Sequence, residues 1–194
     1  SQNRLIMTLK NEVEREFYLK LTHKEKYSVR ELERQIDSSL FERTIIGNQK
    51  LSTVLKELHP KIENNFKDNY VLEFLGLPTQ HSESNLQKSL VQNMKNFILE
   101  LGKDFIFVGE EYRVQVGNSD FFIDLLFFHR ELSALVAFEL KVGKFKPEHL
   151  GQLSFYLEAL DRDVKKPHEK PSIGVLLCSD KDDEVVEYAL SRHL

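Results

Sequence analysis

Apolar residues recur at helical spacing through the first part of the chain. One series occupies every fourth position: Leu5, Leu9, Val13, Phe17 and Leu21. This spacing predicts an amphipathic helix. A second helix is expected over 29–43, because Ser28 and Glu31 form a capping box ahead of apolar residues spaced by four. Two shorter helices are expected over 51–58 and 69–75, and no strand is expected in this region.

A polar stretch over 77–84 interrupts this pattern. We take it as the boundary between a helical region, 1–77, and a second domain, 78–194. A long amphipathic helix is expected directly after it. This helix should begin at Ser84, whose capping box is completed by a Gln three residues later, and should end at Gly102.

Beyond that helix the apolar pattern changes to a period of two, which predicts strands. The expected strands are 105–108 with 112–116, as a pair or as one bent strand, then 121–128, 135–142 and 173–178. Helices are expected over 147–160 and 182–190, with a charged, mobile loop over 161–171. Because a helix joins the last two strands, they should run parallel through a right-handed crossover. The sequence therefore predicts a mixed α/β fold with an αβββαβ core, preceded by a helical region.

The composition is that of an ordinary globular protein and excludes disorder across the whole chain. Hydrophobic residues make up 41% and charged residues 30%, with a net charge of −4. No apolar run approaches the roughly 20 residues of a membrane helix. The single cysteine excludes a disulfide framework and a cysteine-built zinc site, and it favours a reducing cytoplasm. The charged first 25 residues argue against a signal peptide, and the missing initial Met suggests a piece of a longer protein.

One acidic residue interrupts the most apolar expected strand. Asp124 lies among Phe, Ile and Leu residues, where an ionised carboxylate is costly to bury unless it is compensated. On the next strand Glu139 and Lys141 are two residues apart and so share a face. Antiparallel pairing through the turn over 129–133 would place Asp124 roughly opposite Glu139. Two carboxylates and one ammonium are therefore expected to converge.

This trio admits two interpretations. In one it is a structural ion cluster that holds neighbouring strands in register. In the other a divalent cation offsets the surplus negative charge, and carboxylate oxygens are ligands that suit Mg²⁺ or Mn²⁺.

The motif Asp124…Glu139-x-Lys141 resembles the active-site signature of the PD-(D/E)XK nuclease superfamily, and the expected element order resembles its restriction-endonuclease-like core. The wider sequence resembles the YhcG-type branch of predicted bacterial nucleases. Segments that carry this resemblance include 120–130, 138–141, 151–157 and 173–178, with 27–36 and 70–77 in the helical half. The resemblance covers nearly the whole chain.

The resemblance implies an activity and a role for each motif residue. Asp124 and Glu139 would bind Mg²⁺ or Mn²⁺ together with the backbone carbonyl of Leu140. Lys141 would orient or deprotonate the attacking water and offset transition-state charge. Such an arrangement meets the needs of phosphodiester hydrolysis, namely a nucleophile at neutral pH and neutralisation of developing oxygen charge.

Further candidates lie around this motif. Gln152 and Tyr156 are four apart on one helix face, and their spacing resembles the RecB-type subgroup, in which the pair borders the active site. The alternative is a solvated Gln and a core Tyr. Glu83 is the nearest acid in the first core helix and a candidate metal ligand, although Asn85 and Gln87 stand where relatives tend to carry acids.

Lys144 and Lys146 are candidate substrate-binding residues. These two lysines could line a phosphate track together with five other basic residues: Lys103, Arg113, Arg130, Lys165 and Lys166. The alternative is that all seven side chains are merely solvated. The net negative charge of the chain argues against nucleic-acid binding without excluding it, since a patch can be basic on an acidic molecule.

The sequence as a whole predicts a divalent-metal-dependent nuclease that acts on nucleic acid, with DNA as the expected substrate. A non-catalytic nucleic-acid-binding or protein-interaction module on the same scaffold is the alternative. The apolar series over 5–21 also suggests that the helical region pairs with a second copy to form a homodimer.

Overall fold

The computed structural model describes residues 1–41, 53–62, 66, 72, 75 and 82–180. The chain divides into two compact units. The N-terminal unit comprises 1–49 with 66–71, and the C-terminal unit comprises 50–65 with 72–194. The domain boundary at 77/78 stays a prediction. The helices expected over 69–75 and 182–190 lie outside the described residues, except for two isolated positions in the first.

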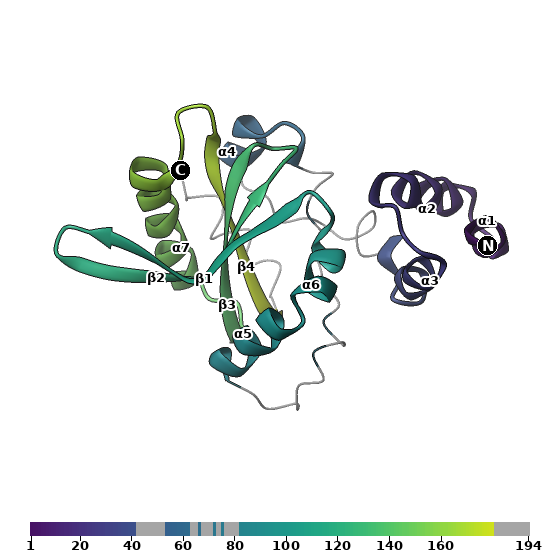
Figure 1. Ribbon diagram of the computed structural model, residues 1–194, viewed down its shortest axis with the longest axis horizontal. Coiled ribbons are helices and arrows are strands. Elements are labelled where there is room, and N and C mark those ends of the chain that lie inside the picture. Colours follow the sequence, from purple (N-terminus) through teal and green to yellow (C-terminus); the bar gives the residue numbers. More distant parts are fainter. Residues whose placement is uncertain (42–52, 63–65, 67–71, 73–74, 76–81, 181–194) are drawn as a thin grey trace. The chain divides into compact units, whose positions relative to one another are not determined.

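The N-terminal unit begins with two helices where one was expected. Helix α1 spans Gln2–Thr8 and α2 spans Glu12–Glu25 (Figure 1). The chain is extended at Leu9, and the Asn11 side chain accepts a hydrogen bond from the Val13 N–H at 2.9 Å. The prediction of one continuous helix was wrong because Asn11 caps a new helix inside the apolar series.

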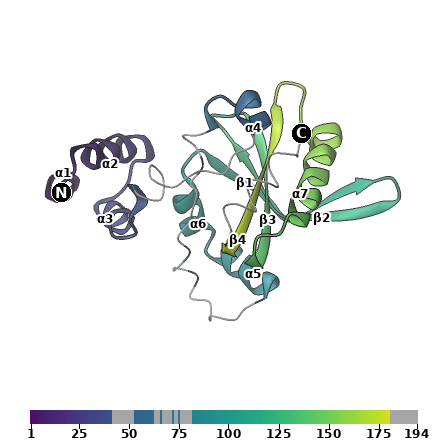
Figure 2. The same cartoon turned by 180° about the vertical axis from the view of Figure 1, so that it is seen from behind.

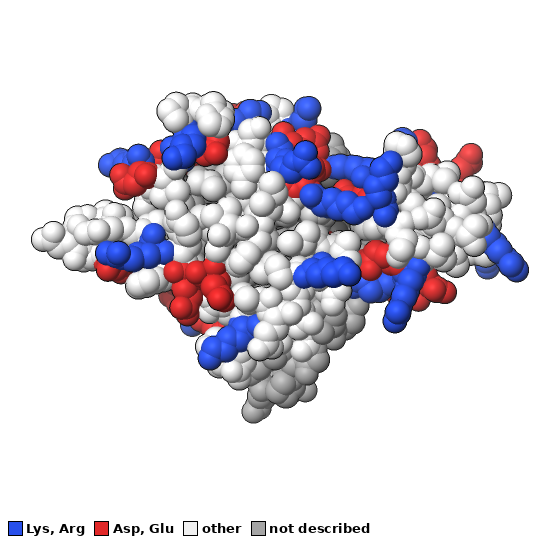
Figure 3. All heavy atoms as spheres, viewed as in Figure 1, with Lys and Arg blue, Asp and Glu red and all other residues white. Residues whose placement is uncertain are grey.

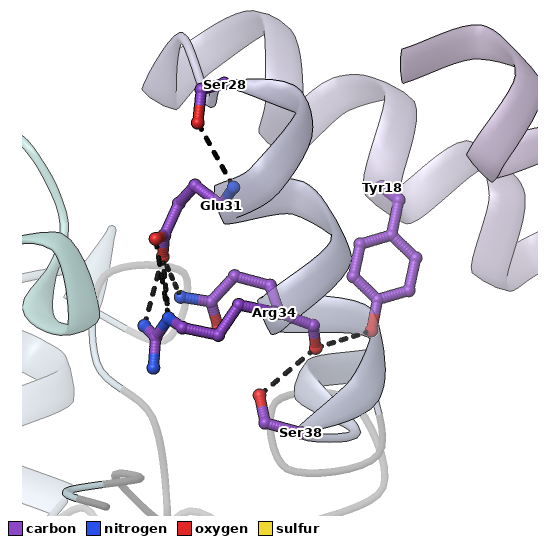
Figure 4. A network of polar contacts seen from close by, with 6 residues as sticks. Tyr18, Ser28, Glu31, Arg34 and Ser38 are labelled. Carbon is purple, nitrogen blue, oxygen red and sulfur yellow. Dashed lines mark hydrogen bonds and ion pairs between the residues drawn. The ribbon is translucent and has the colours of Figure 1, made fainter. Parts of the chain in front are cut away.

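The predicted capping residue of the next helix is confirmed. In α3, Val29–Asp37, the Ser28 hydroxyl accepts from the Glu31 N–H at 3.1 Å (Figure 4). The Glu31 carboxylate turns to Arg34 instead, at 3.0 Å. The helix ends six residues before the predicted 43, because the Ser38 N–H bonds back to the helix and the next residue has a positive φ of 55°.

Most of the apolar series predicted for dimer pairing packs inside this unit. Its core is formed by six buried side chains: Ile6, Tyr18, Tyr27, Leu32, Leu40 and Phe41. Four of the five series residues pack against it: Leu5, Leu9, Phe17 and Leu21. The fifth, Val13, is 60% exposed. The homodimer stays a prediction, but the continuous apolar face that motivated it is largely covered within the unit.

The C-terminal unit is built on a mixed sheet, as predicted. Strands β1 Phe105–Val116, β2 Ser119–His129, β3 Ala134–Lys144 and β4 Lys170–Asp180 lie in the order β1-β2-β3-β4. The first two pairings are antiparallel and β3 pairs with β4 in parallel, which confirms the predicted direction of the last two strands (Figures 1 and 2). Of the two alternatives for β1, the structure has one strand, with a register shift between Phe107 and Gly109 and a positive φ at Glu111.

The expected long helix before the sheet is divided in two. Helix α5 spans Glu83–Gln92 and α6 spans Met94–Leu101, and Gly102 follows α6 with φ 121° as the predicted stop. The cap is Ser82, whose hydroxyl accepts from the Asn85 N–H at 3.2 Å, so the prediction of Ser84 was wrong. Starting two residues earlier places Glu83 in the first turn, where its carboxylate reaches β3.

The remaining elements are α4, Thr53–Leu58, and α7, Glu148–Ala159, which continues into a π-helical turn over Leu160–Val164. The segment over 161–171, expected as a mobile loop, therefore starts as helix. It is tied to β4 by Asp161, whose carboxylate accepts from the Ser172 N–H at 2.8 Å. Among the described residues, no helix is long and apolar enough to cross a membrane.

Helices cover both faces of the sheet (Figures 1 and 2). On one face Phe97 of α6 meets Phe127 and Phe138, with ring centroids 5.9 Å apart in each pair. On the other face Leu153 and Tyr156 of α7 belong to a buried cluster with residues of β1, β2 and β3. A Cβ on Gly174 of β4 would lie 2.7 Å from the Leu153 side chain. The missing side chain therefore lets α7 approach the sheet closely.

Candidate active site

The paired strands bring together the three residues of the predicted motif. Leu125 pairs with Phe138, so Asp124 and Glu139 lie directly beyond the last pair of this ladder, and the charge of Asp124 acts on the Glu139 carboxylate. The Lys141 ammonium lies 2.9 Å from Oε1 of Glu139. The predicted convergence is therefore present in the C-terminal unit.

Asp124 occupies a position where the strand pairing lapses on both sides. The β2–β3 ladder extends only as far as Leu125, and the β1–β2 register has no partner for Asp124 between its neighbours. The Asp124 carboxylate bonds directly to the backbone of β3, since its Oδ2 accepts a hydrogen bond from the Leu140 N–H at 2.8 Å. Because the N–H and C=O of one strand residue face the same neighbour, the Leu140 carbonyl faces this side as well.

Burial makes the two carboxylates unfavourable as anions. It raises the pKa of Asp124, although the hydrogen bond from Leu140 and the charge of Lys141 lower it. Burial likewise raises the pKa of Glu139, which is only 2% exposed. Oε2 of Glu139 is buried and has no hydrogen-bond partner among the described residues. Such an orphaned anionic oxygen is costly and calls for a positive partner.

Lys141 supplies only part of that positive charge. Burial lowers its pKa, but the hydrogen bond to Glu139 and the nearby acids more than offset this and raise it. Glu83 is one of these acids, since its Oε2 lies 3.6 Å from the Lys141 ammonium and its Oε1 accepts from the Val142 N–H at 3.3 Å. Three carboxylates thus surround one ammonium.

The donor set fits a hard divalent cation. Mg²⁺ is usually held by one or two carboxylates while it keeps several waters. Asp124 and Glu139 supply two carboxylates, and the Leu140 carbonyl adds a neutral oxygen. The Glu139 Oε2, which has no hydrogen-bond partner among the described residues, is an available ligand. No three His, Cys, Asp or Glu side chains are grouped to hold one ion in the described part of the chain. Glu83 as a metal ligand therefore stays a prediction.

Helix α7 brings the second predicted pair to the same region. The Gln152 amide donates to the Tyr156 hydroxyl at 2.9 Å. Burial raises the pKa of Tyr156, the bond from Gln152 lowers it, and the charges of Glu139 and Asp124 raise it further. The Tyr156 hydroxyl is therefore within electrostatic reach of the carboxylates. Tyr156 is also a core residue, so the alternative interpretation describes its ring correctly.

The basic residues are more dispersed than a continuous track requires. Lys144 and Lys146 are exposed at the end of β3 and just beyond it. Lys146 lies 3.6 Å from Glu148, and Arg113, out on the β1–β2 hairpin, pairs with Asp120 at 2.9 Å. Acidic side chains also gather where that hairpin leaves the sheet (Figure 3). Substrate binding by Lys144 and Lys146 stays a prediction.

Two residues near the site were not predicted. The Gln87 side-chain amide donates to the backbone carbonyl of Asp124 at 3.1 Å. Burial lowers the pKa of His149, and the charge of Lys141 lowers it further. The His149 ring is therefore within electrostatic reach of Lys141. Its Nδ1 accepts from the Lys146 N–H at 3.2 Å. The sequence places Gln87 in the expected capping box and at a position where relatives tend to carry acids, but only the tertiary structure brings Gln87 and His149 to the site.

The comparisons with known proteins agree with the motif. The family model described as the YhcG PDDEXK nuclease domain matches residues 63–194. The chain belongs to this nuclease family. A second model, the DUF1016 N-terminal domain, matches residues 1–43. The resemblance inferred from the sequence is therefore confirmed, and the PDDEXK match includes every candidate residue of the site.

Relatives give the extent of this likeness. The chain is 39% identical over 190 residues to the protein named "Putative nuclease YhcG" of Escherichia coli (strain K12), which covers 96% of the chain. The chain spans about half of that relative, 51% of its length. A repair endonuclease from Pyrococcus abyssi matches with a TM-score of 0.43 and 17% identity, over 60% of this chain and 46% of that one.

Proposed function

We propose that the C-terminal unit hydrolyses phosphodiester bonds of nucleic acid, with DNA as the expected substrate, and that it requires Mg²⁺ or Mn²⁺. The observation that carries this proposal is the convergence of Asp124, Glu139 and Lys141, with one buried Glu139 oxygen that has no hydrogen-bond partner in the described part of the chain. Membership in a nuclease family supports the same reaction class.

The charge balance explains why a cation is required. Asp124, Glu139 and Glu83 together carry more negative charge than Lys141 offsets, so the bare site would repel an anionic phosphodiester. Mg²⁺ or Mn²⁺, when bound, supplies an activated water and offsets negative charge on the phosphate. Asp124, Glu139 and the Leu140 carbonyl would hold the cation.

Lys141 and α7 act on the substrate side of this arrangement. The Lys141 ammonium orients the attacking water and offsets charge that develops on the phosphate oxygens. Gln152 is held by Tyr156 through their hydrogen bond and so presents a fixed polar group to the phosphate or to a water. Lys144 and Lys146, exposed beyond Lys141, would contact the flanking backbone.

The test is a panel of labelled DNA and RNA substrates incubated with Mn²⁺, with and without a chelator. We expect cleavage of DNA by the wild type, none with the chelator, and a loss of roughly 10²- to 10³-fold in Lys141→Ala. Lys95→Ala, which changes an exposed lysine of α6, is the matched control. Equal cleavage by wild type and Lys141→Ala would refute the proposed role.

The acidic side chains around the β1–β2 hairpin favour a second candidate function, a module without catalytic activity. In that case the unit is a nuclease-like scaffold that binds nucleic acid or protein without turnover. DNA that is bound by the wild type and left uncut at every Mn²⁺ concentration would identify this module. A homodimer through the N-terminal helices and a cytoplasmic location remain predictions, the first checked by light scattering at high concentration.

A further inference from the structure

The backbone of Asp124 depends on a side chain from outside the sheet. Asp124 has no Cα partner in the β1–β2 register or in the β2–β3 register. The Gln87 amide of α5 donates to the Asp124 carbonyl at 3.1 Å, in a half-buried setting. Loss of this contact from a half-buried carbonyl costs free energy and weakens the hold on the main chain at Asp124.

Helix α5 is anchored well enough to hold this contact. Leu86 and Leu90 on α5 are buried, which fixes the helix against its unit. Glu83 and Gln87 are four apart and lie on one helix face. Glu83 bonds to the Val142 N–H of β3 while Gln87 bonds to β2, so one helix face connects the two strands of the site.

We propose that Gln87 is a positioning residue for Asp124. Its amide fixes the main chain at Asp124, which keeps the carboxylate on the Leu140 N–H and close to Glu139. Gln87 itself touches neither substrate nor cation. The catalytic consequence rests on the proposed function, whereas the positioning can be measured without any turnover.

The size of the effect follows from the contact. A single neutral hydrogen bond changes a conformational equilibrium by about five- to tenfold. Without Gln87, the bond between Asp124 and the Leu140 N–H should therefore open more often by about that factor. The Leu140 amide is a direct reporter, because its hydrogen exchanges with solvent only when that bond opens.

The experiment compares Gln87→Met with Gln92→Met in the full chain. Met keeps the volume and helix propensity of Gln but has no donor, and Gln92 is an exposed residue of the same helix. Amide hydrogen exchange at Leu140, measured without cation or substrate, should accelerate about five- to tenfold in Gln87→Met and stay unchanged in Gln92→Met. The amides of Phe127 and Val136 in the same sheet should not change in either variant.

Cleavage kinetics give the second readout. We expect kcat of Gln87→Met to fall about five- to tenfold while KM stays within about twofold, since substrate contacts are untouched. Unchanged Leu140 exchange in Gln87→Met would overturn the inference, as would an equal rise at Phe127 and Val136. If Leu140 responds but the wild type cuts nothing, the positioning stands and the proposed function fails. If the wild type cuts and Leu140 does not respond, only the positioning fails.

Discussion

Glu31 in the N-terminal unit and Glu139 in the C-terminal unit both lie beside a basic side chain, but their surroundings differ. Glu31 accepts from Arg34 at 3.0 Å and from Gln35 at 2.8 Å, beside the Ser28 cap (Figure 4). Glu139 has Lys141 on one oxygen and no partner on the other among the described residues. A network that serves only the fold satisfies its charges locally, whereas the Glu139 site keeps an unmet demand for positive charge.

An orphaned atom alone does not mark a functional site. Three neutral groups in the described residues share this property: Thr22 Oγ1, His59 Nδ1 and Ser172 Oγ. Glu139 differs because its orphaned atom belongs to a carboxylate and because Asp124 and Glu83 lie close by. The combination of an orphaned anion and surplus like charge is what indicates a cation site.

The largest expected effect is a loss of cleavage when a carboxylate of the site is neutralised, compared with no loss when Glu31 is neutralised. Asp124→Asn keeps an acceptor for the Leu140 N–H but removes the charge, so Mn²⁺-dependent cleavage should fall by roughly 10³-fold. Glu31→Gln should cleave like the wild type. The comparison is wrong if both variants lose activity to the same extent in an initial-rate assay.

The next largest effect is a loss of stability from crowding the contact between Gly174 of β4 and Leu153 of α7. Gly174→Ala would put a Cβ 2.7 Å from Leu153, and overpacking of this kind costs about 1–3 kcal/mol of unfolding free energy. Urea denaturation measures it. Adding Leu153→Val should recover part of the loss, and no recovery would show that the close approach of α7 is not its cause.

The network around Glu31 should respond modestly to loss of its cap. Ser28→Ala removes the acceptor for the Glu31 N–H and should cost about 1 kcal/mol, again by urea denaturation. Cleavage should be unchanged. A cost near zero would mean that solvent replaces the cap.

The smallest expected effect is a change in the pH dependence of stability caused by His59, whose buried Nδ1 has no hydrogen-bond partner among the described residues. Its Nε2 lies 2.8 Å from the Pro171 carbonyl, and burial lowers its pKa below the ordinary 6.5. Because the unfolded chain binds this proton more readily, stability should fall as pH drops below 6.5 and level off beneath the folded-state pKa. His59→Gln keeps a donor for Pro171 and cannot titrate. The difference between the two stability profiles should therefore be confined to that range, and parallel profiles would exclude His59.

The central trio could be predicted because its determinants are local. Continuous apolar runs joined by a short turn predict that β2 and β3 pair, so the sequence alone brings Asp124 close to Glu139. The cap at Ser82 was missed because Ser84 offers an equally good local motif, and the contact of Glu83 with β3 accompanies the earlier start. Asn11 interrupts an apolar series that periodicity alone cannot divide. Gln87 and His149 are positioned only by packing between elements.

The most direct test of the cation site is a calorimetric titration of Mn²⁺ into the wild type and into Glu139→Gln, without nucleic acid. Gln matches Glu in size but cannot offer a second anionic oxygen, so we predict saturable binding to the wild type and at least tenfold weaker binding to the variant. Glu31→Gln should bind like the wild type. No binding to the wild type, or equal binding to Glu139→Gln, would contradict the assignment of Asp124, Glu139 and Lys141 to a metal-dependent active site.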